Sequence, residues 1–264
     1  MDAVSEPTAD RRLAGRTAIV TGAGQGVGEG IARRLAALGA NVVVAARRSE
    51  TGEPVAAAIR ARGDEAVCIV TDVTRRGDVE ACVDATVERY GALEIVVHNA
   101  LAGAIPHRLE DIDWDTHWAA MSATTGWASL WCAQAARPHL LAAGARGRLI
   151  LVSSPSGIEG SANIPLYSPA KAGQRALAKS LAKEWGPHGV TVNCIAPVAE
   201  SPALSAAFAG NPALKAAMEA RTPLRRVGRP EQDIGSVVAF LASDDAGYVT
   251  GQTIVCDGGS FMGL

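Results

Sequence analysis

Short apolar runs and longer stretches of helical spacing alternate along this chain from about residue 15 to its end. The runs are continuously apolar rather than alternating, and most are rich in Val and Ile, which is typical of strands buried on both faces of a parallel sheet. The predicted strands are Thr17–Thr21, Asn41–Ala46, Ala66–Val70, Leu93–His98, Arg148–Ser153, Thr191–Ile195 and Thr253–Cys256.

Stretches with helical periodicity separate these runs. The predicted helices are Gly26–Leu38, Glu53–Arg62, Arg75–Tyr90, Thr116–Leu141, Ser168–Trp185 and Glu231–Leu241. Strands that alternate with helices are joined by right-handed crossovers in a parallel sheet. The pattern therefore predicts an α/β fold: a Rossmann-type doubly wound sheet of about seven strands between helices, in three α/β/α layers.

The length of 264 residues is compatible with one domain, because α/β sheets often reach ~250 residues as a single unit. We expect residues 1–14 to be a flexible leader and residues 15–264 to form the domain. Residues 197–230 carry five prolines and form a long connection between a strand and the next helix. Such connections are often lids over ligands, so we expect a substrate lid here, with an irregular surface connection as the alternative.

Charge and composition exclude several classes of protein. The net charge of −2 gives no electrostatic reason to bind nucleic acid or a membrane surface. No apolar run approaches the ~18 residues of a membrane helix, and the polar N-terminus lacks the apolar core of a secretory signal. The five cysteines include no C-x-x-C pair, which favours reduced thiols over a disulfide or metal framework. We expect a cytoplasmic protein without a metal.

A glycine-rich turn, TGAGQGVG (residues 21–28), joins the first predicted strand to the first helix. Glycines let backbone N–H groups approach a pyrophosphate, and the helix N-terminus adds a partial positive charge. The common G-x-G-x-x-G spacing is absent, because Val27 stands where the third glycine belongs. The turn predicts dinucleotide binding, with a plain turn as the alternative. The predicted contacts are Gly22, Gln25, Gly26, Val27 and Gly28.

Tyr167 and Lys171 are four residues apart in the segment YSPAK. This spacing places both side chains on one face of a helix, one turn apart. A free phenol has a pKa near ~10, and a neighbouring ammonium favours its ionised form. Tyr167 is therefore predicted to protonate a developing alkoxide, or to accept the alcohol proton in the reverse direction.

The T-G-x-x-x-G-x-G turn and the Y-x-x-x-K pair resemble the single-domain short-chain dehydrogenases/reductases over roughly residues 14–262. Ser154 precedes Tyr167 by 13 residues, which matches the spacing of that family's catalytic serine. The resemblance implies hydride transfer between a nicotinamide and a ketone or secondary alcohol, as in carbonyl reductases, alcohol dehydrogenases or 3-oxoacyl reductases. Ser154, Tyr167 and Lys171 would be catalytic: Ser154 would stabilise the charge on the substrate oxygen, and Lys171 would also hold the nicotinamide ribose.

The end of the second predicted strand indicates which cofactor binds. An acidic residue about 20 positions after the glycines would bind the adenosine ribose of NAD, but Ala46 occupies the strand end. Arg47 comes next, and its guanidinium suits a ribose 2′-phosphate. We therefore expect NADP(H) rather than NAD(H). The alternative is that Arg47 and Arg48 are only a solvated pair in the loop.

The same resemblance implies further cofactor contacts. Asp72 and Val73 would frame the adenine, although a helix cap formed with Thr74 is the structural alternative. The segment HNAL (residues 98–101) resembles the family's N-N-A-G, so Asn99 and Ala100 would lie beside the nicotinamide ribose. His98 in this segment is expected to be a packed histidine rather than a catalyst.

After the sixth predicted strand the family's N-x-x-x-P-G pattern is retained at Pro197, while Val198 replaces the glycine. A β-branched residue favours negative φ, so we expect an altered loop. Pro197 and Val198 would contact the nicotinamide carboxamide, with Ser201 as an additional contact. By the same resemblance the chain would form a homo-oligomer, a tetramer or a dimer.

The family's catalytic Asn is missing, because no Asn occurs between Asn99 and Asn163. Counting back from the following segment places Thr125 in its position, and counting forward from the preceding one places Met121 there. A Thr hydroxyl can donate and accept hydrogen bonds, or Thr125 can be an ordinary helix residue. These departures leave open an NADP(H)-binding pseudoenzyme with a regulatory or structural role. An enoyl reductase or a sugar epimerase on the same sheet is a separate alternative.

Overall fold

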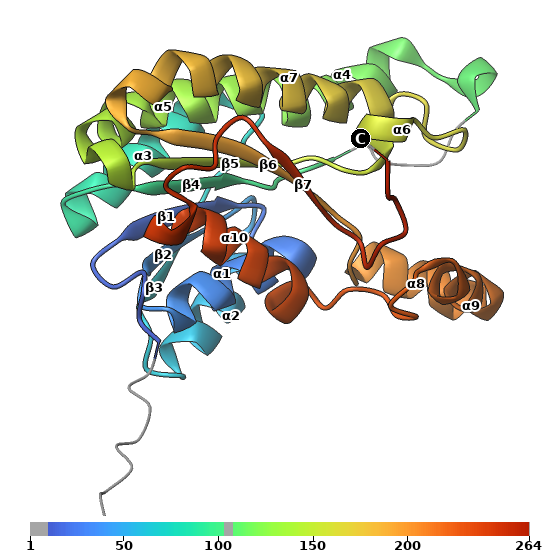
Figure 1. Cartoon of the computed structure of the whole chain (residues 1–264), viewed down its shortest axis with the longest axis horizontal. Helices are drawn as coiled ribbons and strands as arrows, with labels where there is room; N and C mark the ends of the chain where they lie inside the picture. Colours follow the sequence, from blue (N-terminus) through green and yellow to red (C-terminus); the bar gives the residue numbers. More distant parts are fainter. Residues whose placement is uncertain (1–9, 103–107, 264) are drawn as a thin grey trace, which may run out of the picture.

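The structure is a computed structural model that describes residues 10–102 and 108–263. Seven parallel strands form one sheet in the order β3-β2-β1-β4-β5-β6-β7. The reversal of strand order beside β1 is that of the doubly wound fold, so the predicted fold class is confirmed (Figure 1). The strands are β1 (Thr17–Thr21), β2 (Asn41–Ala46), β3 (Ala66–Val70), β4 (Ile95–His98), β5 (Arg148–Val152), β6 (Thr191–Pro197) and β7 (Thr253–Cys256).

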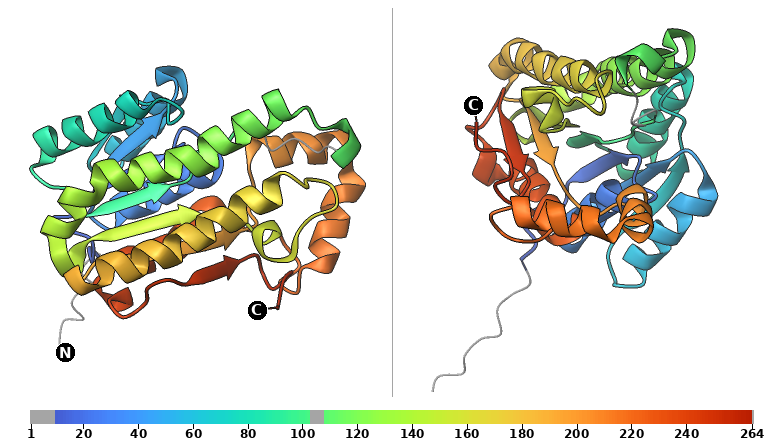
Figure 2. Two further views of the ribbon diagram at one scale, coloured as in Figure 1. Left: turned by 90° about the horizontal axis from the view of Figure 1, so that it is seen from above. Right: turned by 90° about the vertical axis from the view of Figure 1, so that its right-hand side faces the viewer.

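Helices cover both faces of the sheet (Figures 1 and 2). One layer consists of α1 (Gly26–Ala37), α2 (Ser49–Arg60) and α10 (Ser236–Ala242), and the other of α3 (Arg76–Tyr90), α5 (Ala128–Ala143) and α7 (Tyr167–Trp185). Shorter helices are α4 (Ala119–Ser122), α6 (Ser156–Glu159), α8 (Pro202–Gly210) and α9 (Pro212–Arg221).

Successive residues of each central strand point to opposite faces, which divides the core into two parts. In β1, Ala18 and Val20 belong to the cluster under α1, α2 and α10. Ile19 between them belongs to the cluster under α3, α5 and α7. Both faces are apolar, which explains why these strands read as continuous rather than alternating runs.

The predicted helix Thr116–Leu141 is longer and less regular than expected. The chain is helical from Trp114 to Ala143, but Trp114–Trp118 and Ala123–Trp127 form π-helical turns on either side of α4. Each wide turn rotates the side chains that come after it relative to a uniform α-helix. Counting residues along this helix to locate the family's Asn position therefore gives a different answer from each end.

The segment 197–230 contains the two helices α8 and α9, which the apolar pattern did not predict. Pro202 and Pro212 each occupy the first turn of one helix, where a missing N–H costs nothing. Two of the five prolines in this segment are therefore helix starts. The segment leaves the carboxyl end of β6.

The N-terminal boundary also differs from our expectation. Residues 1–9 lie outside the described part of the chain, whereas Leu13 is fully buried in the core. Its N–H donates to the carbonyl of Leu38, 3.0 Å away, so the folded domain begins before residue 15. No helix in the described ranges has the length and apolar character needed to cross a bilayer.

Candidate active site

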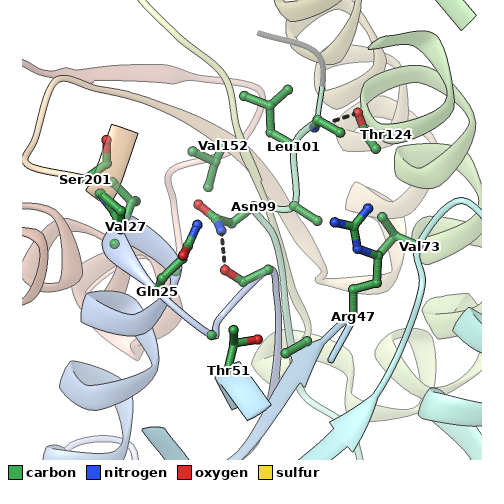
Figure 3. Close-up of a pocket in the computed structure, with 18 of the residues that line it drawn as sticks. Gln25, Val27, Arg47, Thr51, Val73, Asn99, Leu101, Thr124, Val152 and Ser201 are labelled. Atoms are coloured by element: carbon green, nitrogen blue, oxygen red, sulfur yellow. Dashed lines mark hydrogen bonds between the residues drawn. The ribbon is translucent and has the colours of Figure 1, made fainter. Parts of the chain in front are cut away.

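A groove of about 530 Å³ opens at the carboxyl edge of the sheet, where the loops after β1 and β4 separate. This is the place where ligands bind in doubly wound folds. In Figure 3, Gln25, Val27 and Ser201 face the groove from one side, and Arg47 and Val73 from the other. All predicted cofactor contacts line it: Gly22, Gln25, Gly26, Val27, Gly28, Arg47, Asp72, Val73, Asn99, Ala100, Tyr167, Lys171, Pro197, Val198 and Ser201.

The glycine turn leaves no room for side chains. Gly22 has a φ of +65°, and a Cβ there would lie 2.7 Å from the Cα of Ala100. A Cβ on Gly28 would lie 2.3 Å from the carbonyl oxygen of Gly22. The amide of Asn99 donates to the carbonyls of Thr21 and Gly22, each at 3.1 Å. The turn is therefore held close to the loop after β4, with the first turn of α1 facing the groove, as a pyrophosphate requires.

The groove's outer end is basic. Arg47 and Arg48 come directly after β2, line the groove and are exposed. Thr51 also lines it, and its hydroxyl donates to the carbonyl of Arg48 at 3.0 Å. Thr51 was not among the predicted contacts, although its distance of three residues from Arg48 is typical of such a turn. The residues at this end are suited to a dinucleotide that carries a 2′-phosphate.

Tyr167 and Lys171 begin α7 and face the groove's inner end. The ammonium nitrogen of Lys171 lies 5.7 Å from the centre of the Tyr167 ring. Burial raises the pKa of the Tyr167 phenol, and a hydrogen bond with the Ser154 side chain opposes this effect. The structure thus brings the three predicted catalytic side chains together at the end of β5.

Ser153 has a different part from Ser154. Its hydroxyl donates to the backbone carbonyl of Lys171 at 2.9 Å, which fastens the first turns of α7 to the end of β5. The Ser154 oxygen accepts from the N–H of Ser156 at 3.2 Å. Ser153 therefore fixes the height of Lys171 above the groove.

Comparisons with known proteins agree with this arrangement. A family model described as Enoyl-(Acyl carrier protein) reductase matches residues 22–260. Tropinone reductase-like 3 of Erythroxylum coca is 34% identical, covering 98% of both chains. Cis-4-hydroxycyclohexanecarboxylate dehydrogenase of Sinomonas cyclohexanicum is 38% identical, covering 94% of this chain and 97% of that protein.

A solved structure gives the same result for the fold. Gluconate 5-dehydrogenase from Burkholderia cenocepacia J2315, in complex with NADP and tartrate, superposes with a TM-score of 0.88 at 31% identity. The match covers 97% of this chain and 99% of that one. The chain belongs to the short-chain dehydrogenase/reductase family. It is an oxidoreductase of CH–OH and C=O groups, as its relatives are named.

In this short-chain dehydrogenase/reductase neither of the two positions considered for the family's Asn, Met121 and Thr125, lines the groove. The hydroxyl of Thr125 donates to the carbonyl of Met121 at 2.7 Å and is buried in its own helix. Thr124 lines the groove instead, and its oxygen accepts from the N–H of Ala102 at 3.2 Å. The π-helical turn Ala123–Trp127 directs Thr124 rather than Thr125 to the groove. Counting residues from a neighbouring motif does not reveal such a turn.

His98 is packed beneath the site, as expected. Its Nε2 lies 2.9 Å from the carbonyl of Thr124, which only accepts, so Nε2 carries the proton. Its Nδ1, 3.0 Å from Thr21 Oγ1, then accepts from that hydroxyl. Burial lowers the His98 pKa to about 4. The neutral ring links the strand ends of β1 and β4 to the wide helical turn.

Asp72 forms the cap with Thr74 that we considered as its structural alternative. Its Oδ1 accepts from the N–H of Thr74 at 3.0 Å and from the Thr74 hydroxyl at 2.7 Å. Asp72 and Val73 nevertheless line the groove. The cap fixes the loop after β3, and the second oxygen of Asp72 is not used by this cap.

The loop after β6 accommodates Val198 without backbone strain. Among the described residues, Arg225 is the only non-glycine residue with positive φ. The N–H of Val198 donates to the carbonyl of Cys256 at 3.0 Å, which continues the pairing with β7. Ser201 accepts from the N–H of Leu204 at 3.2 Å and so caps α8. Its hydroxyl therefore has a structural partner as well as a place on the groove wall.

Proposed function

We propose that this protein is an NADP(H)-dependent oxidoreductase that interconverts a ketone and a secondary alcohol. The supporting observation is that Tyr167 and Lys171 line the inner end of a glycine-lined groove whose outer end carries Arg47, and that the Ser154 side chain is hydrogen-bonded to Tyr167. Gluconate 5-dehydrogenase, which has the same fold, was solved with NADP.

The residues of the groove fit a dinucleotide from end to end. The first turn of α1 would face the pyrophosphate, Arg47 the 2′-phosphate, and Lys171 the nicotinamide ribose. A nicotinamide bound there would supply the hydride to the carbonyl carbon, with both electrons of the new C–H bond. Tyr167 donates the proton that completes the alcohol, while the Ser154 hydroxyl donates a hydrogen bond to the same oxygen.

Electrostatics at Tyr167 favour proton transfer. Burial raises the phenol pKa, whereas the nearby Lys171 ammonium favours the phenolate. The phenol therefore keeps its proton until an alkoxide develops and yields it with the ammonium beside it. In the oxidative direction the same pair accepts the alcohol proton.

The substrate side of the groove is apolar. Leu101, Ala102, Val198 and Ala199 line it beside Pro202, the first residue of α8. This lining suits a medium-sized ketone with few polar groups. We propose that α8 and α9, within segment 197–230, form the lid over this part of the groove.

We further propose that the protein forms a homodimer or homotetramer through the outer faces of α5 and α7. Trp127 and Trp131 stack with ring centres 6.2 Å apart, and Trp127 is exposed. On α7, Ala172, Gly173 and Ala176 are exposed, and such small residues permit close helix packing.

The proposal is tested by a turnover screen with NADPH beside NADH over 3-oxoacyl, steroid, cyclic and aryl ketones, with an enoyl thioester added. We expect ketone-dependent oxidation of NADPH. Tyr167→Phe should lower kcat by about 10²–10⁴-fold while NADPH binding, measured by fluorescence, is retained.

Tyr248→Phe is the matched control, because Tyr248 is fully exposed and outside the groove. NADPH binding without turnover of any ketone would overturn the proposal and favour a non-catalytic role. Turnover of the enoyl thioester alone would favour the enoyl reductase alternative.

A further inference from the structure

A buried chain of polar side chains leads from the catalytic lysine into the neighbouring helix. The Lys171 ammonium donates to the Gln174 carbonyl oxygen at 3.0 Å and to the backbone carbonyl of Val152 at 2.6 Å. The Gln174 amide nitrogen donates to the Ser129 hydroxyl at 2.9 Å. Ser129 in turn donates to the backbone carbonyl of Thr125. The three residues whose side chains form it, Lys171, Gln174 and Ser129, are at most 2% exposed.

The direction of every hydrogen bond in this chain is fixed. The ammonium only donates, so it requires the oxygen of Gln174 rather than its nitrogen. The proton of Ser129 is committed to the Thr125 carbonyl, so the hydroxyl oxygen accepts from the amide nitrogen. Ser129 therefore holds the Gln174 amide in the orientation that presents an acceptor to Lys171.

We propose that Gln174, oriented by Ser129, is a positioning residue that keeps Lys171 protonated and extended toward the groove. This rests on the proposed function, in which Lys171 serves Tyr167 and the cofactor. The series of hydrogen bonds ends at the carbonyl of Thr125, in the same helical segment where the family's Asn is missing. A side chain from α7 thus supplies the acceptor for the ammonium inside the protein.

Lys171 needs such an acceptor because its surroundings disfavour charge. Burial lowers the pKa of Lys171 to about 7. The titratable groups that act on it are Tyr167 on α7, Cys194 on β6 and His98 on β4. None of these is a carboxylate, and no salt bridge of Lys171 occurs within residues 10–102 and 108–263. Hydrogen bonds to neutral oxygens are therefore what stabilises the charged form.

The protein contains only four lysines, so the pKa of Lys171 can be measured directly. They are Lys171, Lys179, Lys183 and Lys215. Protein labelled with ¹³C at lysine Cε gives four signals, and the Lys171 signal is assigned by its loss in Lys171→Arg. Its pKa is then read from a pH titration without any turnover.

Two substitutions at one position should move this pKa in opposite directions. Gln174→Met keeps the length but removes the acceptor, and should lower the Lys171 pKa by about one unit. Gln174→Glu adds a carboxylate beside the ammonium, and should raise it by at least about one unit. A purely structural role predicts no opposite shifts. Gln134→Met, on the exposed side of α5, is the control and should leave the pKa unchanged.

Activity gives a second measurement. In Gln174→Met the pH profile of kcat should shift with the titration and kcat at pH 7 should fall about tenfold, with a smaller change in KM for NADPH. Gln174→Glu should restore kcat at this pH. An unchanged Lys171 pKa in both variants would overturn the proposal.

Two further outcomes keep the test decisive. If Gln174→Met fails to fold, Ser129→Ala replaces it, since freeing the amide should also lower the Lys171 pKa. If the wild-type protein reduces no ketone while the lysine titration responds as described, the proposed function fails and the positioning role of Gln174 stands.

Discussion

At the scale of single residues, the two ends of the groove make different chemical demands. The outer end relies on exposed charge from Arg47 and Arg48, which lie just after β2. The inner end relies on buried groups such as His98 and Lys171, whose pKa values burial lowers to about 4 and about 7. In the proposed function the exposed charge would select the cofactor, whereas burial sets the protonation state of the inner groups.

Replacing Arg47 should therefore change cofactor preference rather than chemistry. A hydrogen bond to a charged group contributes about 1.5–3 kcal/mol, so Arg47→Ala should weaken NADPH binding about 10–100-fold and leave NADH binding unchanged. The dissociation constants of both cofactors, measured by fluorescence titration, check this. Arg62→Ala, outside the groove, is the control. Equal losses for NADPH and NADH would assign Arg47 to another part of the cofactor.

His98 should give the protein an acid sensitivity of its own. The pKa of this ring is about 4 when folded and about 6.5 in the unfolded chain, so the unfolded state binds the extra proton between these values. The stability is present above about pH 6.5 and is lost as the pH falls toward 4. At pH 4.5 the loss from this group amounts to about 2.5 kcal/mol.

His98→Asn tests this sign. Asn cannot take up the proton, so its free energy of urea unfolding should fall by about 2.5 kcal/mol less than that of the wild type between pH 7 and pH 4.5. Carboxylates titrate in both proteins and cancel in the difference. An identical pH dependence of the two proteins would show that His98 does not titrate in this range.

At the scale of elements, burial decides the strands, and local chemistry decides the segments that the sequence did not predict. Four of the strands have the predicted bounds: β1 and β2, which are almost entirely buried, and the edge strands β3 and β7, which are only partly buried. A continuous apolar run marked both kinds of strand. The site residues were found because turns and helix starts lie at fixed distances from strand ends. Thr124 was missed because two π-helical turns displace the side chains of that segment.

The same limit applies to Gln174 and to helices α8 and α9. A polar residue at a buried helix position is visible in sequence only as a break in the apolar pattern, and its partner Ser129 lies on another helix. Pro202 and Pro212 have the same residue type whether they break a chain or begin a helix. In both cases the outcome depends on residues that are distant in the sequence, so a local sequence pattern cannot predict it.

The β1–α1 turn should be intolerant of even one methyl group. A Cβ on Gly28 would meet the backbone oxygen of Gly22 at 2.3 Å and the Asn99 amide at 2.5 Å. Backbone cannot yield cheaply, so Gly28→Ala should cost about 1–3 kcal/mol of stability and displace the turn. NADPH affinity should fall at least about tenfold.

Gly77→Ala is the matched control for that substitution. Gly77 is also helical, in the first turn of α3, and a Cβ there meets nothing within 4 Å. It should stabilise the protein by up to about 1 kcal/mol and leave NADPH affinity unchanged. Normal affinity in Gly28→Ala would mean that the turn relaxes around the extra methyl.

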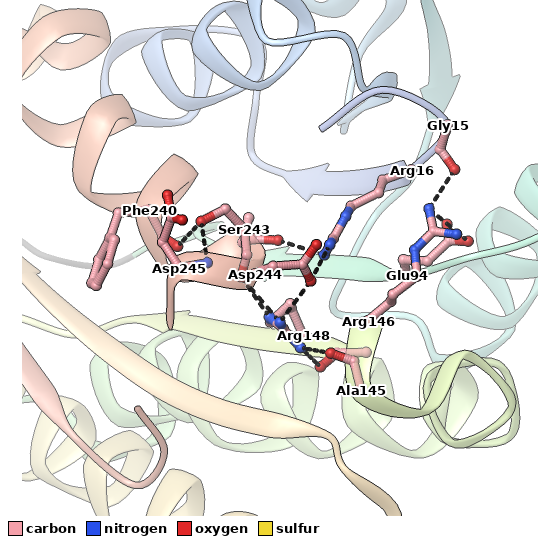
Figure 4. Close-up of polar contacts among 12 residues, drawn as sticks. Gly15, Arg16, Glu94, Ala145, Arg146, Arg148, Phe240, Ser243, Asp244 and Asp245 are labelled. Carbon is pink, nitrogen blue, oxygen red and sulfur yellow. Dashed lines mark hydrogen bonds and ion pairs between the residues drawn. The ribbon is translucent and has the colours of Figure 1, made fainter. Parts of the chain in front are cut away.

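At the scale of the whole molecule, the two edges of the sheet have different tasks. The carboxyl edge holds the groove, while the amino edge holds two buried arginines, Arg16 and Arg148 (Figure 4). Arg16 donates to the carbonyl of Ala242 at 2.9 Å and pairs with Asp244 at 2.5 Å. Arg148 donates to the carbonyl of Ser243 at 3.0 Å. These contacts join the starts of β1 and β5 to the end of α10.

Arg148 should therefore support stability without serving the reaction. Arg148→Met would leave the carbonyls of Ala145 and Ser243 without its donors, at a cost of about 3 kcal/mol in the free energy of unfolding. NADPH affinity and kcat at 25 °C should change less than about twofold, because the groove lies at the opposite strand ends. Urea unfolding at one protomer concentration measures the free energy of unfolding, and fluorescence titration measures NADPH affinity.

The control is Arg62→Met, which breaks only an exposed pair with Glu231 and should cost at most about 1 kcal/mol. A large loss of NADPH affinity in Arg148→Met, at a temperature where the variant is folded, would show that the amino edge also shapes the groove.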